Sequence, residues 1–412
     1  MTDKTKSDAP LPSGLQLTAL DPDFRENPHA ILKRLRETSP VYHDQAMERY
    51  IVTTEALVDE VLRDRSMSVE AQNAKPNPIN QAIARRLQPD ADRRPSMLRL
   101  DDPEHQRLRS LVNKAFTPRA VERMRPRTIE IAESLLDEIG DRETFDIISE
   151  FSGPLPTVVI AEMLGVDPAR RADFKRWSDT LVLGFLPFPT EEQEAMMRDA
   201  RRNLDEVFQE EISKRRAEPR DDLIGRMVAA EEKGDQLTDE EIVTMCGLLL
   251  IAGNVTTTDL IGNGVYVLLN HPEQADLLRR EPERIENAVE EMLRYDGPVT
   301  NTSRIAMRDM ELGGCPIEKG DTIIVSIAGA NHDPAFIDRP DEFDVTREDI
   351  EHHAFGGGAH YCLGAQLARM EAQVGINALL QRFPKLRLAD EAPVRRGIPV
   401  FRGFEKLPVA TR

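Results

Sequence analysis

The feature that most constrains the fold is a long apolar run in the second half of the chain. Thr238 and Glu241 match the capping box of a helix start, helix-forming residues continue to Asn270, and His271-Pro272 ends the run. This predicts a helix of roughly 32 residues, about 48 Å long at 1.5 Å per residue. Its middle, CGLLLIAG, is apolar on every side, so the helix has to be buried all round. The rest of the chain must therefore fold around it.

Hydrophobic periodicity elsewhere is mostly helical, with a few short β-branched runs. The pattern predicts helices at 28–37, 54–63, 119–139 and 198–216, and strands at 41–42, 49–52 and 321–329. The predicted fold class is therefore mainly α with a minor β part.

The spread of Pro and Gly residues indicates how many domains the chain forms. They punctuate the sequence singly, without a long linker, repeat or low-complexity tract. We expect residues 1–18 to form a flexible N-terminal tail and residues 19–412 to form a single domain. A chain of 412 residues would otherwise allow two or three domains.

The acidic composition limits the partners that the protein can bind. The chain has 54 Lys+Arg against 73 Asp+Glu, a formal net charge of −19, which disfavours nucleic acid and anionic membrane surfaces. Its longest apolar stretch, 245–253, is far shorter than the roughly 20 residues of a spanning helix. The polar N-terminus does not resemble a signal peptide, and three scattered cysteines offer no disulfide framework. We expect a cytoplasmic monomer that binds neither nucleic acid nor membrane.

The segment with the most specific chemistry is FGGGAHYCLG, from Phe355 to Gly364. Three consecutive glycines predict a loop whose backbone can pass close to a flat or bulky group. Cys362 ends this loop just before a helical sequence, where the helix dipole and the free N–H groups of Leu363 and Gly364 favour a thiolate. A cysteine near a helix start is usually structural, but the glycines, the preceding Phe and His360 favour a functional one.

The residues 355–365 resemble the haem-binding signature F-G-x-G-x-H-x-C-x-G-x of the cytochrome P-450 superfamily, in its soluble bacterial class. The resemblance implies a haem b cofactor, buried between the long central helix and the cysteine-bearing loop. It makes Cys362 the axial thiolate ligand of the haem iron, places Phe355 beside the sulfur, and directs His360 to a haem propionate. A thiolate ligand pushes electron density toward O–O cleavage.

Other motifs extend the resemblance from about residue 20 to the C-terminus. Glu291 and Arg294 match the family's E-x-x-R pair, for which we expect a structural role. The family's third partner is an Arg in a later loop; here Glu342 stands near its expected place and Arg347 lies further on, so this partner stays open.

Three further residues offer donors to the carboxylates of haem. His105 and Arg109 match an H-x-x-x-R motif, and Arg304 matches another motif of the family. The resemblance implies that these side chains bind the haem propionates, for which Arg and His are suitable donors.

The polar patch in the long helix is similar to the family's oxygen-binding groove, A-G-x-(Asp/Glu)-Thr. Ala252-Gly253 opens the groove and Thr256 would donate a hydrogen bond to dioxygen. Val255 stands where the family has an acid, and valine cannot relay protons. Asn254 and Asp259 are the substitutes that the sequence offers, so we assign Thr256, Asn254 and Asp259 to the catalytic group.

The resemblance implies a monooxygenase that hydroxylates a small hydrophobic or moderately polar organic substrate. The sequence holds no flavoprotein segment and no iron–sulfur cysteine cluster, so electrons would come from a ferredoxin and an NAD(P)H-dependent ferredoxin reductase. By position, the substrate pocket would include Leu249, Ala252, Val299, Thr300 and Phe401, with the loop 66–97. The alternatives are a peroxide-driven enzyme, a coupling or dehydrating enzyme, and a non-catalytic haem sensor.

Overall fold

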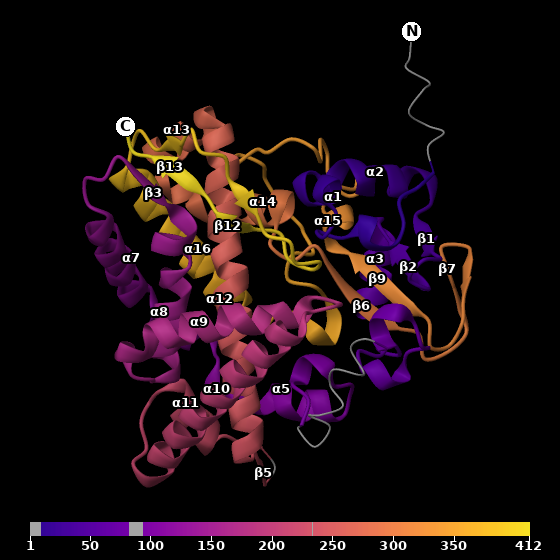
Figure 1. Cartoon of the computed structure of the whole chain (residues 1–412), viewed down its shortest axis with the longest axis horizontal. Coiled ribbons are helices and arrows are strands. Elements are labelled where there is room, and N and C mark those ends of the chain that lie inside the picture. Colours follow the sequence, from indigo (N-terminus) through magenta and orange to yellow (C-terminus); the bar gives the residue numbers. More distant parts are fainter. Residues whose placement is uncertain (1–9, 82–93, 233) are drawn as a thin grey trace.

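The computed structural model describes residues 10–81, 94–232 and 234–412. It is mostly helical with short strands, which confirms the predicted fold class (Figure 1). The helices are α1 (Pro22–Glu26), α2 (Pro28–Thr38), α3 (Glu55–Arg63), α5 (Glu104–Ala115), α6 (Pro118–Glu122), α7 (Arg125–Ile139), α8 (Pro154–Leu164), α9 (Arg171–Val182), α10 (Glu191–Ala217), α11 (Leu223–Ala229), α12 (Asp239–Asn270), α13 (Pro272–Arg280), α14 (Ile285–Asp296), α15 (Ile327–Ala330) and α16 (Ala365–Arg382). The strands are β1 (Val41–Asp44), β2 (Arg49–Val52), β3 (Thr144–Asp146), β4 (Glu231–Glu232), β5 (Asp235–Gln236), β6 (Asn301–Ile305), β7 (Met310–Leu312), β8 (Cys315–Ile317), β9 (Thr322–Ser326), β10 (Arg387–Leu388), β11 (Val394–Arg395), β12 (Phe404–Lys406) and β13 (Pro408–Ala410).

Helix α12 is the predicted central helix, and it runs through the height of the molecule (Figure 1). The capping box is present: Glu241 N donates to Thr238 Oγ1 at 3.2 Å and Thr238 N donates to Glu241 Oε2 at 2.9 Å. Among the described residues, α12 is the one helix long and apolar enough to cross a membrane, but 61% of its apolar window is buried in protein. Contacts with α8, α9, α10, α14 and α16 surround it, as expected for a core helix.

A glycine lets two helices approach α12 closely. A side chain at Gly264 would place its Cβ 2.6 Å from the sulfur of Met292 on α14 and 3.0 Å from Ile376 on α16. Both distances are shorter than van der Waals contact, so any side chain there would force Met292 and Ile376 to shift. This packing holds α16, the helix that follows the cysteine-bearing loop, directly against the central helix.

The main sheet has the strand order β1-β2-β9-β6 and lies beside α2 and α3, on the side of the molecule that carries the N-terminus (Figure 1). β1 and β2 pair antiparallel, β2 and β9 pair parallel, and β6 and β9 pair antiparallel. The strands predicted at 41–42 and 49–52 are confirmed. The predicted strand 321–329 is shorter: it is β9, and the chain turns into α15 at Ile327, where the Ser326 hydroxyl accepts from Gly329 N.

Two other predictions need correction. The helix predicted over 119–139 is two helices, α6 and α7, which meet at Arg123-Met124, one residue before the Pro-containing first turn of α7. The tail predicted through residue 18 is wrong for Gly14–Leu17, which form a 3-10 helix with Leu17 buried, because Gly14 N donates to the buried Asp44 carboxylate at 2.9 Å. The remaining part of the predicted tail, 1–9, lies outside the described residues.

Candidate active site

Cys362 lies in the loop before α16, with Gly364 as the N-cap of the helix. Cys362 N donates to Phe355 O at 3.0 Å, which closes the loop on itself. Burial by the surrounding protein raises the pKa of the Cys362 thiol, while the Gly364 N–H and the charges of Arg109 and Arg369 act to lower it. The Gly364 amide is therefore the helix-terminal donor that the sulfur uses, and no bond from Leu363 N to the sulfur is present among the described contacts.

The glycines before Cys362 fit the loop against α3. Gly356 and Gly358 have φ angles of 71° and 64°, in the left-handed region that favours glycine. A Cβ on Gly358 would lie 2.3 Å from the carbonyl oxygen of Leu62, in the last turn of α3. Any side chain at 358 would therefore force the loop and α3 apart.

Phe355 is half-buried and is covered by a cation. The guanidinium of Arg369 lies 4.5 Å from the ring centroid, and it binds Glu290 through bonds of 2.6 and 2.8 Å. His352 completes this group through a 3.1 Å contact with Glu290. The ring beside the cysteine loop is thus fixed by charged groups on α14 and α16.

The predicted propionate donors come together from three separate segments. The rings of His105 on α5 and His360 in the loop lie 4.1 Å apart, and Arg304 on β6 is close enough to lower the pKa of His360. Burial is the main cause of that shift, which lowers the pKa of His360 to about 4 and leaves the ring neutral at pH 7. Burial also lowers the pKa values of Arg109 and Arg304.

These cationic groups fit a carboxylate-bearing cofactor. In the part of the chain that the structure describes, neither Arg109 nor Arg304 has a carboxylate within ion-pair distance, and Arg304 donates only to Ser303 O. Guanidinium groups removed from water are stable when an anion pairs with them. The propionates of haem would supply that anion.

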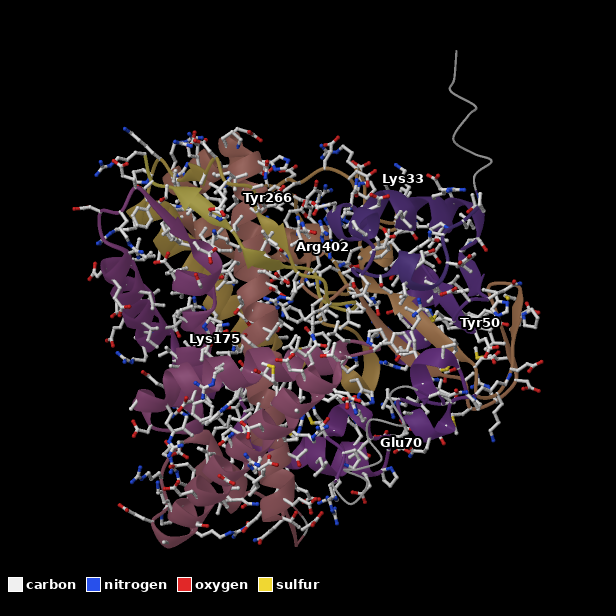
Figure 2. The ribbon with its side chains drawn as sticks, in the orientation of Figure 1. Lys33, Tyr50, Glu70, Lys175, Tyr266 and Arg402 are labelled. Atoms are coloured by element: carbon white, nitrogen blue, oxygen red, sulfur yellow. The ribbon has the colours of Figure 1, made fainter. Side chains whose placement is uncertain are left out.

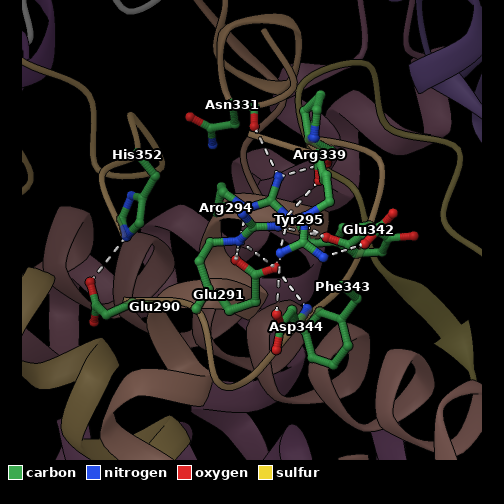
Figure 3. Close-up of polar contacts among 12 residues, drawn as sticks. Glu290, Glu291, Arg294, Tyr295, Asn331, Arg339, Glu342, Phe343, Asp344 and His352 are labelled. Carbon is green, nitrogen blue, oxygen red and sulfur yellow. Dashed lines mark hydrogen bonds and ion pairs between the residues drawn. The ribbon is translucent and has the colours of Figure 1, made fainter. Parts of the chain in front are cut away.

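The E-x-x-R pair is buried completely, and it holds the loop after α15 (Figure 3). Arg294 Nε and Nη2 donate to the Glu291 carboxylate at 2.7 and 2.8 Å. Arg294 also donates to the carbonyls of Asn331, Pro340 and Glu342 at 2.8–3.1 Å. The third partner is Arg347, whose Nε lies 3.4 Å from Glu291 Oε2; Glu342 contributes its backbone carbonyl.

The polar residues of the predicted oxygen groove, Thr256 and Asn254, differ in burial and in hydrogen-bond partners. Thr256 is half-buried, and its hydroxyl donates to Ala252 O one turn earlier at 2.6 Å. Asn254 is fully buried: its Oδ1 accepts from Thr157 at 2.8 Å and its Nδ2 donates to Ser178 at 2.5 Å. Residues two apart do not share a helix face. The role of Asn254 as a substitute proton donor stays a prediction; in this structure its amide ties α12 to α8 and α9.

Asp259 is buried with one oxygen in an ion pair and the other without a partner. Its Oδ2 lies 3.2 Å from Arg396 Nη1, while Oδ1 has no hydrogen-bond partner among the described residues. Burial raises the pKa of Asp259 to about 7, against the opposing charge of Arg396. Near neutral pH, this carboxyl can therefore hold or release a proton.

The sequence analysis missed a second buried acid, Glu371 on α16. It is fully buried, it hydrogen-bonds the side chain of Thr257, and its Oε1 has no partner among the described residues. Burial raises its pKa to about 8, so the group is mostly neutral at pH 7. The sequence feature that could have indicated this buried acid is a lone glutamate among the inward-facing apolar positions of the helix after Cys362, such as Leu367 and Met370.

Two of the five predicted substrate-pocket residues lie together, and the other three lie in different surroundings. Val299 and Phe401 form a β-bridge and pack with Val255, in an apolar cluster completed by Val182 and Ile398. Phe401 also contacts Phe185 edge to face, with centroids 4.8 Å apart.

The other three residues differ in their surroundings. Thr300 bonds to Val400 O at 3.3 Å beside the apolar cluster, and Ala252 is exposed on α12 although the helix is central. Leu249 packs in the main hydrophobic core. Within the predicted loop 66–97, residues 82–93 lie outside the described part of the chain.

A cysteine at a helix N-terminus, with Arg109 and Arg304 lacking carboxylate partners among the described residues, fits a haem-thiolate protein. The comparisons with known proteins agree. The model of the family "Cytochrome P450" matches residues 9–394. Cytochrome P450 107B1 of Saccharopolyspora erythraea is 40% identical over 95% of this chain and 97% of its own length. The solved structure of the Bacillus subtilis bacillaene polyketide synthase cytochrome P450 PksS has a TM-score of 0.86 and 36% identity, and covers 95% of this chain and 99% of that chain. The chain therefore belongs to the cytochrome P450 family.

Membership in this family makes the protein an oxidoreductase of the monooxygenase class with a haem-thiolate cofactor. Other relatives have names that state an activity, such as the 6-deoxyerythronolide B hydroxylase of S. erythraea, 41% identical over 75% of this chain and 76% of its own length. Such relatives imply redox partners and organic substrates as broad classes.

Proposed function

We propose that the protein hydroxylates a small hydrophobic or moderately polar organic molecule, with haem b as cofactor and Cys362 as its axial ligand. The observation that carries the proposal is the environment of Cys362: the Gly364 N–H faces the sulfur, and Arg109 and Arg304 have no carboxylate partners among the described residues. When bound, haem supplies the activation of dioxygen, and the protein supplies position, protons and exclusion of water.

The apolar cluster of Val182, Val255, Ile398 and Phe401 is proposed as one wall of the substrate pocket. It meets α12 at Val255, next to Thr256, so a substrate on this wall would lie close to the proposed oxygen-binding residue. Apolar side chains favour an apolar face of the substrate. Val299 and Phe401, with Thr300 and Ala252 beside them, would orient it, and Leu249 contributes to the core behind this wall.

Proton delivery is proposed to use acids outside position 255. Glu371 holds a proton at pH 7 and shares a hydrogen bond with Thr257, the neighbour of Thr256 in the chain. Asp259 lies three residues after Thr256, and its Oδ1 has no hydrogen-bond partner in the described part of the chain. A positioned acid contributes about 10²–10⁴ in rate. We propose that Asp259, which is three residues after Thr256 and so on the same side of α12, is the main donor toward the Thr256 hydroxyl, and that Glu371 beside Thr257 is the second.

The second candidate function is peroxide-driven oxidation, and Val255 is the observation that favours it. Valine is buried in the apolar cluster and can neither bind nor transfer a proton. An enzyme that receives peroxide needs fewer protons from the protein than one that reduces dioxygen. A coupling reaction or a haem-sensing role has no comparable support in the described residues.

Electrons are proposed to come from a ferredoxin and an NAD(P)H-dependent ferredoxin reductase. One structural neighbour, P450BioI, was solved with an acyl carrier protein that bears hexadec-9Z-enoic acid. A carrier-bound substrate is thus the alternative to a free small molecule. We further propose that residues 19–412 act as one domain, and that the protein is a cytoplasmic monomer.

The test begins with a screen of compounds for the spin-state shift that accompanies displacement of water from ferric haem. Compounds that bind are then incubated in parallel with ferredoxin, reductase and NAD(P)H, and with hydrogen peroxide alone. A hydroxylated product that requires the ferredoxin chain supports the proposal. Equal or faster product formation with peroxide alone would favour the second candidate, and haem binding without turnover in either arm would favour a sensor.

A further inference from the structure

A small cavity lies away from the Cys362 loop, between the N-terminal helices and the C-terminal hairpin. Its walls come from the start of α1 and α2, the turn between β11 and β12, and the segment after α14. Its volume is about 10 Å³, the space of a single small body. Four arginines are among the residues that line it: Arg25, Arg395, Arg396 and Arg402. Tyr266 and Arg402, both labelled in Figure 2, mark this region on α12 and on the hairpin turn.

Two of the four guanidinium groups are fully paired. Arg402 forms a close ion pair with Asp296 and donates to the carbonyls of Arg25 and Glu26 at 2.7 and 3.3 Å. Arg396 pairs with Asp259 at 3.2 Å and donates to Phe404 O at the same distance. These two pairs use the carboxylates of Asp296 and Asp259.

Arg395 is buried without sufficient partners. Its Nη2 is 3.6 Å from Asp296 Oδ2, which Arg402 already shares, and its guanidinium lies over the rings of Phe404 and Tyr266 at 4.2 and 5.1 Å. Its Nη1 is buried and has no hydrogen-bond partner among the described residues. Burial and the charge of Arg402 both lower the pKa of Arg395.

The surrounding charges do not balance this group. Arg25 has no carboxylate within ion-pair distance in the described chain, and His29, with its pKa lowered by burial, adds no negative charge. Glu26 acts on Arg395 only at longer range and is itself exposed. The buried Arg395 and Arg402 therefore share the single carboxylate of Asp296, and a buried cation without its own counter-charge is costly.

We propose that this cavity binds one small monovalent anion of the size of chloride, held by Arg395 Nη1. The small volume favours a single-atom anion over sulfate, phosphate or a substrate carboxylate with its carbon chain. The ion would connect the hairpin turn to the N-terminal helices. Phe401 and Thr300 line the same cavity, so the ion would also brace the proposed wall of the substrate pocket from behind.

The first test compares thermal unfolding of the holoprotein in sodium chloride and in sodium gluconate at equal ionic strength. We expect chloride to raise the melting temperature by roughly 2–4 °C with saturation, and gluconate to have no such effect. Arg395→Gln is expected to abolish the difference between the salts. Lys33→Gln is the matched control, because it removes one positive charge from an exposed ion pair with Asp341 and should retain the difference.

The second test uses the unchanged chain, so it holds even where Arg395→Gln does not fold. Crystals soaked in sodium bromide should show an anomalous peak within hydrogen-bond distance of Arg395 Nη1. Identical melting curves in the two salts together with no bromide peak would overturn the proposal and leave a water molecule in the cavity.

Discussion

Replacing Glu371 with glutamine is expected to change how stability depends on pH. Glu371 is fully buried, and its pKa rises from the ordinary 4.5 to about 8 because burial disfavours the charged form. Below pH 4.5 the group is neutral in both the folded and the unfolded chain. Above pH 4.5 the unfolded chain ionises this carboxyl and the folded chain does not, so stability falls as the pH rises toward 8.

The size of the effect follows from the shift. Each unit of pKa difference corresponds to about 1.4 kcal/mol, so the penalty at pH 7 is about 3 kcal/mol relative to pH 4.5. Glu371→Gln keeps the size of the side chain and removes the ionisation. An unpaired N–H of the buried glutamine amide lowers the free energy of unfolding, but that cost is independent of pH. The difference in unfolding free energy between the variant and the unchanged protein should therefore grow by about 3 kcal/mol between pH 4.5 and 7.

The assay is urea unfolding of the haem-loaded protein at several pH values from 4.5 to 8, followed by the far-ultraviolet circular dichroism. Glu405→Gln, at an exposed position on β12, is the matched control and should leave the pH dependence unchanged. Parallel curves for Glu371→Gln and the unchanged protein across this range would refute the reasoning, because they would mean that Glu371 is ionised in the folded protein. The same variant should form less product per NAD(P)H if Glu371 delivers protons.

Four further predictions concern the proposed site. Cys362→Ser should abolish the thiolate-type Soret band of the ferrous–CO complex; retention of the band in this variant would remove Cys362 as the ligand. Arg109→Leu should speed haem transfer to an acceptor apoprotein by about 10- to 100-fold, since a charge-assisted bond contributes roughly 1.5–3 kcal/mol; an unchanged rate contradicts the propionate role. Val255→Glu should raise the product formed per NAD(P)H and lower peroxide release, with haem content measured in the same samples. If the unchanged enzyme already couples NAD(P)H to product tightly and Asp259→Asn has no effect, then the site lacks no acid. Glu291→Gln should destabilise the protein by about 3–5 kcal/mol because Arg294 loses its buried partner, which denaturant unfolding can measure.

Much of the scaffold could be predicted because its signals are local. The limits of α12 follow from a capping box and a His-Pro stop, and the glycine-rich loop before Cys362 follows from residues that are adjacent in the sequence. The break between α6 and α7 was missed because the apolar periodicity continues across it, although Pro126 marks the first turn of the second helix.

The parts of the site that the sequence could not predict depend on contacts between distant segments. Asn254 binds Thr157 on α8 and Ser178 on α9, 97 and 76 positions earlier, so its motif position alone could not predict these bonds. Arg347 reaches Glu291 from a loop 56 residues later, and several charged residues lie in that loop. The apolar pattern of α16 could have indicated that Glu371 is buried, but its pairing with Thr257 depends on how α16 packs against α12, which no local pattern specifies.

The contact between Gly358 and Leu62 has a consequence for protein engineering. The loop backbone packs directly against the last turn of α3. The shapes of the cysteine loop and of α3 are therefore matched to each other, although nearly 300 residues separate them in the chain. A chimera that takes only the loop from a relative would pack a foreign loop backbone against the original α3, and the two would not match in shape. Exchanging 55–63 together with 353–364 would transfer both packing partners and preserve the position of the cysteine.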